Sequence, residues 1–371
     1  MNIVWMSWKD REHPRAGGAE VVAEELAARL VAAGHTVTLL TSGFPGAAPT
    51  ASRRGVAIIR TGGRFTTYFT TWRYFRQHRA ELAADLVIDE CNTMPYFAAW
   101  YAQVPTALFF HMLCRQIWFY EFPSVLAQLG YLAEPVYLRL LKRRQLTITV
   151  SQSTKADLLR HGFRAADIRV IAEGTHVKPV PSLGRQFSRP TVLSHGSVRP
   201  MKRTLDQVKA FEIAKSTIPT LQLVISGDLS GRYGQRLRRY VAASPYAPDI
   251  QLLGRTTDAE KIQLMRQCHA IAVTSVKEGW GLIVTEAASQ GCPAVVYNVD
   301  GLRDAVRGGQ TGLIVQRNTP AGLAAALIEL LSDEARYAAL RRAAWDWSHE
   351  LTFDQAYADF VAALRSKKLL T

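Results

Sequence analysis

Cysteine is scarce in this chain of 371 residues, and its four cysteines show no Cys-x-x-Cys spacing: Cys91, Cys114, Cys268 and Cys292. The scarcity argues against a disulfide framework and a cysteine zinc site, and it fits a reducing cytoplasm. No apolar run approaches the ~20 residues that a membrane-spanning helix needs. Residues 1–5 begin directly as a strand, with no signal peptide ahead of them. We therefore expect a cytoplasmic protein.

Acidic residues are also few. The sequence holds 31 Asp and Glu against 45 Lys and Arg, which gives a formal net charge of +14. Such an excess indicates a polyanionic partner: a nucleic acid, an acidic membrane surface or a phosphorylated substrate. No Asp-x-Asp occurs anywhere in the chain, so the sequence offers no carboxylate pair of the kind that bridges a metal ion to a diphosphate.

The pattern of the remaining residues predicts an α/β protein with two domains. Hydrophobic residues make up 48% and charged residues 20% of the chain, as in globular proteins, and the length allows two separate cores. Short apolar strands alternate with helices, beginning with a strand over Asn2–Ser7, a helix over Glu20–Ala33 and a strand over Thr36–Thr41. Residues 178–189 lack any period and read as a linker, and the alternation restarts at Thr191.

The most informative stretch follows the apolar strand Ala270–Thr274. That strand ends at a glycine-bracketed loop over residues 278–281, after which the composition favours a helix over Leu282–Gln290. Ligands of parallel sheets lie at the carboxyl ends of the strands. The two glycines of the loop let a ligand approach the backbone, and the N–H groups at the helix start favour a phosphate. Glu278 and Glu286 are strong acceptors for sugar hydroxyls; the alternative is that both are solvated surface carboxylates.

Glu278 and Glu286 are separated by seven residues within a Glu-Gly-Trp-Gly-Leu context, and Asp300-Gly301-Leu302-Arg303-Asp304 and Thr311-Gly312-Leu313 follow. These motifs resemble the nucleotide-sugar site of the retaining glycosyltransferases of family 4, and the resemblance covers most of the chain. It implies a GT-B fold, in which two Rossmann-like doubly wound domains face a central cleft. Residues 1–177 would bind the acceptor, residues 190–349 would bind the donor, and a crossover helix within residues 350–371 would complete the first domain.

The resemblance also assigns roles to single residues. It makes Glu278 and His111 the catalytic candidates: Glu278 on the hydroxyls of the donor sugar, and His111, which ends the strand Thr106–His111, on the same sugar from the opposite wall. Glu286 would bind the ribose. The other predicted donor-binding positions lie in the turn before the first helix, in a loop beside the base and in the glycine-bracketed loop: Gly17, Gly18, Gly254, Arg255, Gly279, Trp280, Gly281 and Leu282.

One position departs from the family pattern. Members carry Gly-Arg at the turn that follows the first strand of the second domain, and a lysine five residues after that arginine, both on the donor diphosphate. Lys202 keeps the lysine, but Ser197 stands where the arginine is expected. We predict that Arg199 replaces it, with Arg203 as the alternative, because cations must neutralise the charge that the leaving nucleoside diphosphate gains.

Residues 53–79 hold seven arginines, six aromatic residues and no Asp or Glu. Over residues 65–79 the two kinds interleave as in an amphipathic helix that lies in a lipid headgroup layer. The alternatives are a helix whose rings pack on their own domain, and a nucleic-acid groove, which we do not expect because no recognised nucleic-acid fold is present. The apolar-rich helix expected over Leu126–Leu141, with the basic run Lys142-Arg143-Arg144 after it, would add to an acceptor or membrane face; the alternative, and the commoner use of such a helix, is core packing. The predicted membrane or acceptor face consists of Arg64, Phe65, Trp72, Arg73, Phe75 and Arg76.

The sequence thus predicts a retaining glycosyltransferase that needs neither metal nor cofactor. It would move a sugar from a nucleoside-diphosphate sugar to a lipid-linked or cell-surface glycan precursor, in the cytoplasm at the inner face of the membrane. No side chain is an evident nucleophile, which fits front-face substitution assisted by the leaving phosphate. The alternatives are a transferase of the same fold acting on a natural product or small molecule, an epimerase or phosphorylase of that fold, and a non-catalytic protein that binds anionic polymers.

Overall fold

A computed structural model describes residues 1–141 and 145–370, so the basic run Lys142-Arg143-Arg144 lies outside the described residues. The chain divides into two compact units. Unit 1 comprises Met1–Gly174 and the chain from Phe353 onward, and unit 2 comprises Thr175–Thr352. Unit 1 therefore ends three residues before the expected boundary at residue 177. The chain returns to unit 1 three residues after the expected start of the crossover segment at residue 350.

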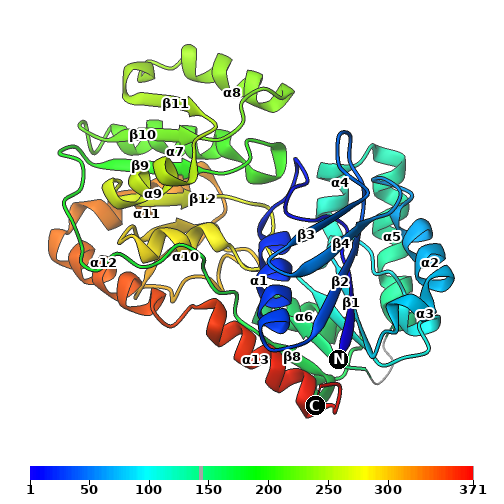
Figure 1. Ribbon diagram of the computed structural model, residues 1–371. Coiled ribbons are helices and arrows are strands. Elements are labelled where there is room, and N and C mark those ends of the chain that lie inside the picture. Colours follow the sequence, from blue (N-terminus) through cyan, green and yellow to red (C-terminus); the bar gives the residue numbers. More distant parts are fainter. Residues whose placement is uncertain (142–144, 371) are drawn as a thin grey trace. The chain divides into compact units, whose positions relative to one another are not determined.

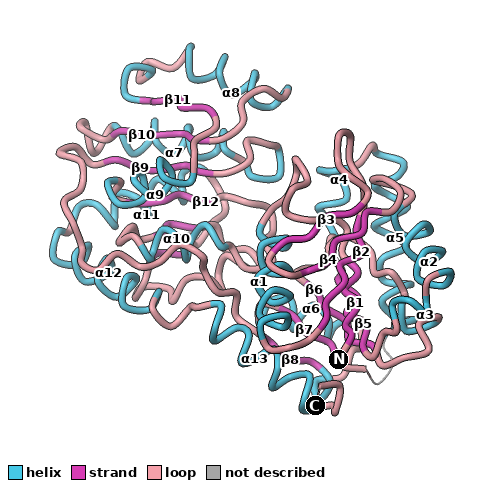
Figure 2. Tube along the Cα trace, viewed as in Figure 1, coloured by secondary structure: helices cyan, strands magenta, loops and turns pink. Residues whose placement is uncertain are grey.

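The expected linker, residues 178–189, is part of unit 2. Figure 2 draws it as loop. Its backbone is nevertheless fixed at two points, because the Val180 N–H donates to the Ser289 carbonyl (3.0 Å) and the Phe187 N–H donates to the Gln267 carbonyl (2.9 Å). The absence of a period in this stretch reflects an extended segment that is hydrogen-bonded to its own unit.

Unit 1 contains an eight-stranded sheet over its described residues, in the order β3-β4-β2-β1-β5-β6-β7-β8. Only the β3–β4 hairpin is antiparallel. The central strands are short and apolar because helices cover both faces of a parallel sheet. The elements are β1 (Asn2–Met6), α1 (Gly18–Ala32), β2 (Thr36–Thr41), β3 (Thr50–Arg53), β4 (Val56–Arg60), α2 (Thr67–Gln77), α3 (Arg79–Leu82), β5 (Leu86–Cys91), β6 (Thr106–Phe110), α4 (Trp118–Glu121), α5 (Ser124–Leu141), β7 (Thr147–Thr149), α6 (Gln152–Arg160), β8 (Ile168–Val170) and α13 (Phe353–Ser366).

The helices of unit 1 separate onto the two faces of this sheet (Figure 1). On one face α13 packs beside α1, and Trp5 of β1 stacks on Phe360 of α13 with ring centroids 5.7 Å apart. On the other face, Val87 of β5 belongs to the cluster that includes Phe75 of α2, and Cys91 belongs to the cluster that includes Leu138 and Leu141 of α5. Alternate side chains of a strand share a face. Hence α2 and α5 cover the same face.

Unit 2, all of which is described, contains a six-stranded parallel sheet in the order β11-β10-β9-β12-β13-β14. The chain runs outward from β9 to β10 and β11, and then returns to add β12, β13 and β14 on the other side, so the order reverses between β9 and β12. Ligands of such sheets bind at this reversal, outside the carboxyl ends of the strands. The elements are β9 (Thr191–His195), α7 (Thr204–Lys215), β10 (Gln222–Ser226), α8 (Arg232–Ala242), β11 (Ile250–Gly254), α9 (Asp258–Gln267), β12 (Ala270–Val273), α10 (Leu282–Ser289), β13 (Ala294–Val296), β14 (Gly312–Ile314), α11 (Pro320–Ser332) and α12 (Glu334–Ser348).

No helix within the described part of the chain has both the length and the apolar character that crossing a bilayer requires.

Candidate active site

A small hollow of about 20 Å³ lies in unit 2 where the strand order reverses. Residues 194–197 at the end of β9, Lys202, and Ser275 after β12 line it, together with Gln207 of α7. The Gln207 amide donates to the Thr274 hydroxyl (2.9 Å), while its Oε1 is buried without a hydrogen-bond partner among the described residues. One acceptor in the wall of the hollow is therefore unsatisfied.

Glu278 and Lys202 form an ion pair in this region. The same Glu278 oxygen, Oε1, accepts a hydrogen bond from the Ser275 hydroxyl (2.5 Å). Burial by itself would raise the pKa of Glu278, but Lys202, Ser275 and the charge of Arg199 outweigh burial and lower it. The side chains of Lys202 and Glu278 are 26% and 16% exposed, so a ligand can reach both partners.

Arg199 and Arg203 differ in what they contact. Arg203 donates to Asp206 (2.7 Å) and lies over the ring of Tyr297. Arg199 is exposed, and its charge acts on Glu278. Of the two candidates for the missing phosphate contact, Arg199 is therefore the one whose charge acts on the Glu278 carboxylate. Its contact with a phosphate stays a prediction.

A second loop braces the Glu278 backbone. The Glu278 N–H donates to the Asp300 carbonyl (3.0 Å), and the Asp300 carboxylate pairs with buried Lys277 (3.1 Å) and with Arg303. Gly301 has φ +79°, and a Cβ there would lie 2.4 Å from the Glu278 carbonyl oxygen. The Asp-Gly-Leu-Arg-Asp motif thus supports the loop that carries Glu278, and only glycine allows this approach.

Gly281 and Trp280 shape the start of α10. Gly281 precedes the first residue of the helix, Leu282, and has φ +113°, which favours glycine. The first N–H groups of a helix have no partners within it. Trp280 is buried, and its indole N–H has no hydrogen-bond partner among the described residues. An unpaired buried donor costs roughly 1–3 kcal/mol.

Glu286 lies buried on α10 between two basic residues. Its Oε2 is 3.2 Å from the Lys261 ammonium and its Oε1 is 3.5 Å from His176 Nδ1. Lys261 is itself buried on α9 and also lies 3.3 Å from Asp258. Neither Lys261 nor His176 was predicted from the sequence, because each lies more than twenty residues from Glu286 along the chain.

The predicted base-side loop follows β11. Gly254 has φ +73°, and the exposed side chain of Arg255 pairs with Asp228 (2.8 Å). The Gly254 carbonyl accepts a hydrogen bond from the Gly227 N–H (2.7 Å). This places the loop beside the end of β10, at the same carboxyl edge of the sheet as the hollow.

His111 of unit 1 is held between two carboxylates. It follows β6 and is 4% exposed; its Nδ1 lies 3.3 Å from Glu173 and its Nε2 lies 3.2 Å from Glu90. Glu90 also accepts from the Trp5 indole (2.6 Å). Burial lowers the pKa of His111, but hydrogen bonds and charge from Glu173 and Glu90 outweigh burial and raise it to about 10. His111 is therefore an imidazolium at neutral pH, and its role on the donor sugar stays a prediction.

The glycine turn before α1 is occupied by a side chain of its own helix. Glu20 is buried, and its Oε2 accepts from the Gly17 N–H (2.6 Å). Its Oε1 pairs with Lys9 (3.0 Å). Gly18 is the first residue of α1. A phosphate at this turn would meet the Glu20 carboxylate, so the diphosphate role of Gly17 and Gly18 requires Glu20 to release that N–H.

Two family models match the chain: Glycosyltransferase Family 4 over residues 16–178 and Glycosyl transferases group 1 over residues 181–347. The chain belongs to these glycosyltransferases. A D-inositol 3-phosphate glycosyltransferase of Rhodococcus jostii is 30% identical over 198 residues, which are 50% of this chain and 43% of that protein. The match thus spans less than half of that relative's length. A glycogen synthase of Mycobacterium tuberculosis is 28% identical over 92% of this chain and 88% of that protein.

Solved structures of the same fold cover nearly the whole glycosyltransferase chain. A sucrose-phosphate synthase from Thermosynechococcus elongatus gives a TM-score of 0.81 with 20% identity over 98% of both chains. Anabaena HepE, solved in complex with UDP and glucose, gives 0.75 with 17% identity over 98% of this chain and 99% of that chain. The GT-B fold that the sequence predicts is confirmed.

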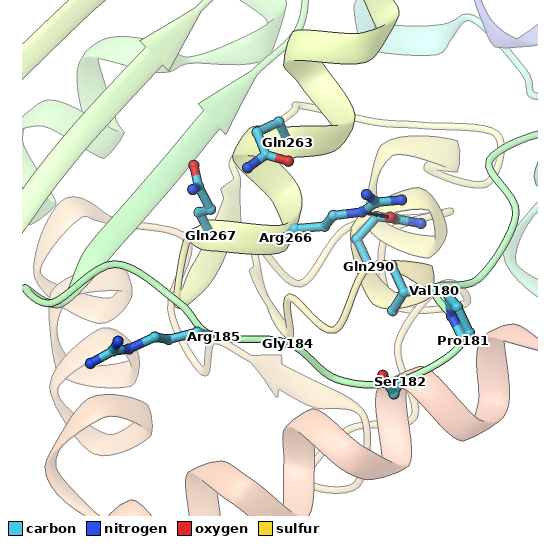
Figure 3. Close-up of a pocket in the computed structure, with 9 residues that line it drawn as sticks. All are labelled: Val180, Pro181, Ser182, Gly184, Arg185, Gln263, Arg266, Gln267 and Gln290. Atoms are coloured by element: carbon cyan, nitrogen blue, oxygen red, sulfur yellow. Dashed lines mark hydrogen bonds between the residues drawn. The ribbon is translucent and has the colours of Figure 1, made fainter.

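A larger hollow of this glycosyltransferase, of about 280 Å³, is not a candidate for the donor (Figure 3). It lies between residues 180–185, the end of α9 and Gln290, where Arg266 donates to Gln290 (2.8 Å). Residues 266–267 precede β12 and Gln290 precedes β13. The hollow therefore lies at the amino ends of the strands, away from the edge where parallel sheets bind ligands.

The predicted membrane face on residues 64–76 needs one correction. Phe75 is 1% exposed and packs among the core residues Val4 and Val87, so it cannot reach a membrane or an acceptor. The sequence prediction failed because aromatic residues occur on both sides of α2. Of the other residues of that face, Phe65, Arg73 and Arg76 are exposed, and Arg64 and Trp72 are half-buried.

Among residues 1–141 and 145–370, no group of three or more His, Cys, Asp or Glu side chains is arranged to hold a metal ion.

Proposed function

We propose that this glycosyltransferase is a retaining, metal-independent enzyme that moves a sugar from a nucleoside-diphosphate sugar to a lipid-linked or cell-surface glycan precursor. The observation that carries the proposal is the Glu278–Lys202 pair beside the hollow between β9 and β12. A carboxylate for sugar hydroxyls and a cation for a phosphate lie next to each other at the ligand edge of the sheet.

The leaving diphosphate is the group that most needs stabilisation. As the bond between the sugar C1 and the phosphate oxygen breaks, negative charge grows on that oxygen, and preorganised cations and N–H groups stabilise it. Lys202, Arg199 and the N-terminus of α10 are the groups of unit 2 proposed for this task. The ion pair with Glu278 holds Lys202 in place before the donor arrives.

Sugar and ribose are recognised by the two glutamates. Glu278 is ionised because its pKa is lowered, and an ionised carboxylate accepts hydrogen bonds from hydroxyls. Glu286, fixed by Lys261 and His176, is proposed to accept from the ribose hydroxyls. His111, as an imidazolium, is proposed to donate its N–H groups rather than to serve as the base that deprotonates the acceptor.

The acceptor hydroxyl then loses its proton to the departing phosphate. The new bond joins the acceptor oxygen to C1 on the face that the phosphate leaves, and the bonding pair of the old C1–O bond stays with the nucleoside diphosphate. This front-face course keeps the anomeric configuration and uses no side-chain nucleophile, as distinct from a covalent double displacement.

The acceptor is proposed from the chain's own residues, because the relatives' names include an inositol phosphate and glycogen, which differ in size and charge. Exposed Arg73 and Arg76 favour an anionic group, such as a lipid-linked phosphate, at the inner face of the membrane.

The test is the anomeric configuration of the product. The protein is incubated with UDP-, GDP- and ADP-sugars, a lipid-phosphate acceptor and EDTA, and the new linkage is assigned by NMR. We expect one donor to give a product with the donor's own configuration. An inverted product contradicts the retaining course, and activity restored only by added metal contradicts metal independence.

A further inference from the structure

Most of the exposed large apolar side chains of the described chain lie on α4 and α5. Eight large apolar side chains of these two helices are exposed, and two more precede or begin α2. They are Phe119, Tyr120, Val125, Leu126, Leu129, Leu132, Val136 and Leu140, with Phe65 and Phe69. Single exposed leucines are ordinary, but a contiguous group of this size marks an interaction surface. We call these ten residues the apolar face.

The apolar face is a regular feature of α5. Val125, Leu129, Leu132, Val136 and Leu140 recur every three or four residues, which places them in one row along the helix. The opposite side of α5 packs in the core through Tyr137, Leu138 and Leu141. The helix therefore carries two apolar sides. One side is buried in unit 1. The folding of unit 1 does not require the other side to be apolar.

The start of α2 is continuous with this surface. The Arg64 guanidinium lies over the ring of Phe65 (5.1 Å) and over the ring of Phe122 (5.5 Å), which connects α4 to α5. Phe119 contacts Tyr131 of α5 with ring centroids 5.5 Å apart. Helices α2 and α5 also cover the same face of the sheet. The aromatic members thus lie beside the aliphatic row.

Charge around the apolar face has one sign. Over residues 67–77 and 118–141, all of which are described, the exposed charged side chains are Arg73, Arg76 and Arg139. Of the two carboxylates of α4 and α5, Glu121 is half-buried, and Glu134 is buried and accepts from the N–H groups of Cys114 and Arg115 (2.7 Å each). The surroundings are complementary to an acidic partner.

We infer that the apolar face docks this protein on the surface of a bilayer that contains acidic lipids. Leucine and valine are under-represented among the residues that dominate protein interfaces, where tyrosine, tryptophan and arginine lead. An interfacial helix needs a row of protruding aliphatic side chains, with aromatic rings beside it and arginines around it. The aliphatic side chains enter the acyl boundary, and the arginines meet the headgroups.

The docking surface differs from the face expected on α2. Its centre is α5, α2 contributes only Phe65 and Phe69 to the apolar part, and Phe75 is excluded. The inference rests on the proposed function only for its use, because docking would bring the enzyme to a lipid-linked acceptor. Binding to the bilayer itself requires no sugar transfer.

The experiment is vesicle flotation with the full-length protein. Phosphatidylcholine vesicles with and without phosphatidylglycerol are compared for the wild type and for Leu132→Ser combined with Val136→Ser; these side chains are 67% and 57% exposed. The matched control is Leu159→Ser combined with Ile213→Ser, at 39% and 44% exposure on α6 and α7. A third variant, Arg73→Gln with Arg76→Gln, tests the charge.

We expect the wild type to float with the acidic vesicles. The α5 variant should bind roughly 100-fold more weakly, at about tenfold for each aliphatic side chain, and the control should bind like the wild type. The arginine variant should lose roughly fivefold per residue, and only with acidic vesicles. Equal flotation of the α5 variant and the wild type overturns the inference, as does a wild type that floats with neither lipid.

Two further measurements distinguish membrane docking from dimerisation and from the proposed sugar transfer. If light scattering shows a wild-type dimer that the α5 variant dissociates, a second copy of the chain covers the apolar face and the docking inference is wrong. Hydrolysis of the donor sugar, measured in solution, should be the same for wild type and α5 variant. Absent hydrolysis in the wild type contradicts the proposed function and leaves the flotation result standing.

Discussion

The two units carry opposite arrangements of charge at the carboxyl ends of their strands. In unit 1 a cation, His111, is enclosed by the carboxylates of Glu90 and Glu173, and all three are buried. In unit 2 a carboxylate, Glu278, meets the cation Lys202 and the Ser275 hydroxyl, and both charged side chains are partly exposed.

The difference in exposure determines what each cluster does. A buried ion pair that loses one partner leaves an uncompensated charge, so the His111 cluster fixes a charge and an orientation. A partly exposed pair can exchange partners at lower cost. In the proposed mechanism, an incoming diphosphate competes with Glu278 for Lys202, and each exchange frees a Glu278 oxygen for a sugar hydroxyl. Donor binding would then make Glu278 available to the sugar in the same step.

The largest expected effect is on the stability of unit 1. His111→Gln should lower the free energy of unfolding by roughly 3–5 kcal/mol at pH 7, because two buried carboxylates lose their cation. The folded-state pKa of His111, about 10, lies above the ordinary 6.5. Its contribution is therefore complete below pH 6.5 and is lost as the pH rises through about 10.

Urea unfolding of the wild type and His111→Gln at pH 7 and pH 10 measures this effect, with His349→Gln, exposed at the end of α12, as the control. The difference between wild type and His111→Gln should shrink at pH 10. A difference that is the same at both pH values would show that His111 is not the charged partner of Glu90 and Glu173.

The next effect is on catalysis in unit 2. Lys202→Ala should reduce kcat/KM for the donor by roughly 10²–10³-fold, as expected when one preorganised donor to a leaving group is removed. Lys209→Ala, on the exposed side of α7, should leave the rate unchanged. A Lys202→Ala enzyme within threefold of the wild type would mean that Lys202 serves only to hold Glu278.

The smallest expected effect distinguishes two glycines that have nearly equal φ angles. Gly301 and Gly309 have φ +79° and +76°, but a Cβ at Gly309 meets nothing within 4 Å, whereas one at Gly301 meets the Glu278 carbonyl. Gly309→Ala should cost only the left-handed strain, about 1–2 kcal/mol. Gly301→Ala should cost more in thermal unfolding and should also weaken donor binding. Equal effects on donor binding would contradict the bracing role of Gly301.

The sequence predicted the local elements of unit 2 well because their signals are local. The expected strand Ala270–Thr274 and helix Leu282–Gln290 correspond to β12 and α10 within a residue or two at each end. Parallel pairing then determines which ends of the strands meet, so the ligand edge of the sheet was predictable before any coordinates.

The partners of the predicted residues were not predictable, because they come from distant parts of the chain. Glu90 and Glu173 converge on His111 across three strands, and Lys261 reaches Glu286 from another helix. The burial of Phe75 and the exposure of Leu132 depend on how each helix is rotated against the sheet. Composition alone does not determine that rotation when apolar residues occupy both sides of α2 and α5.

The most direct test of the donor site is a thermal-shift panel of UDP, GDP, ADP and their common sugar conjugates on the wild type and Glu286→Ala, with Glu329→Ala on the surface of α11 as control. At a hundredfold excess over Kd a ligand adds roughly 2.7 kcal/mol to the stability of the folded state. The account predicts that one nucleotide stabilises the wild type and the control but not Glu286→Ala. A nucleotide that stabilises all three equally, or a wild type that responds to none, contradicts the placement of the donor at this site.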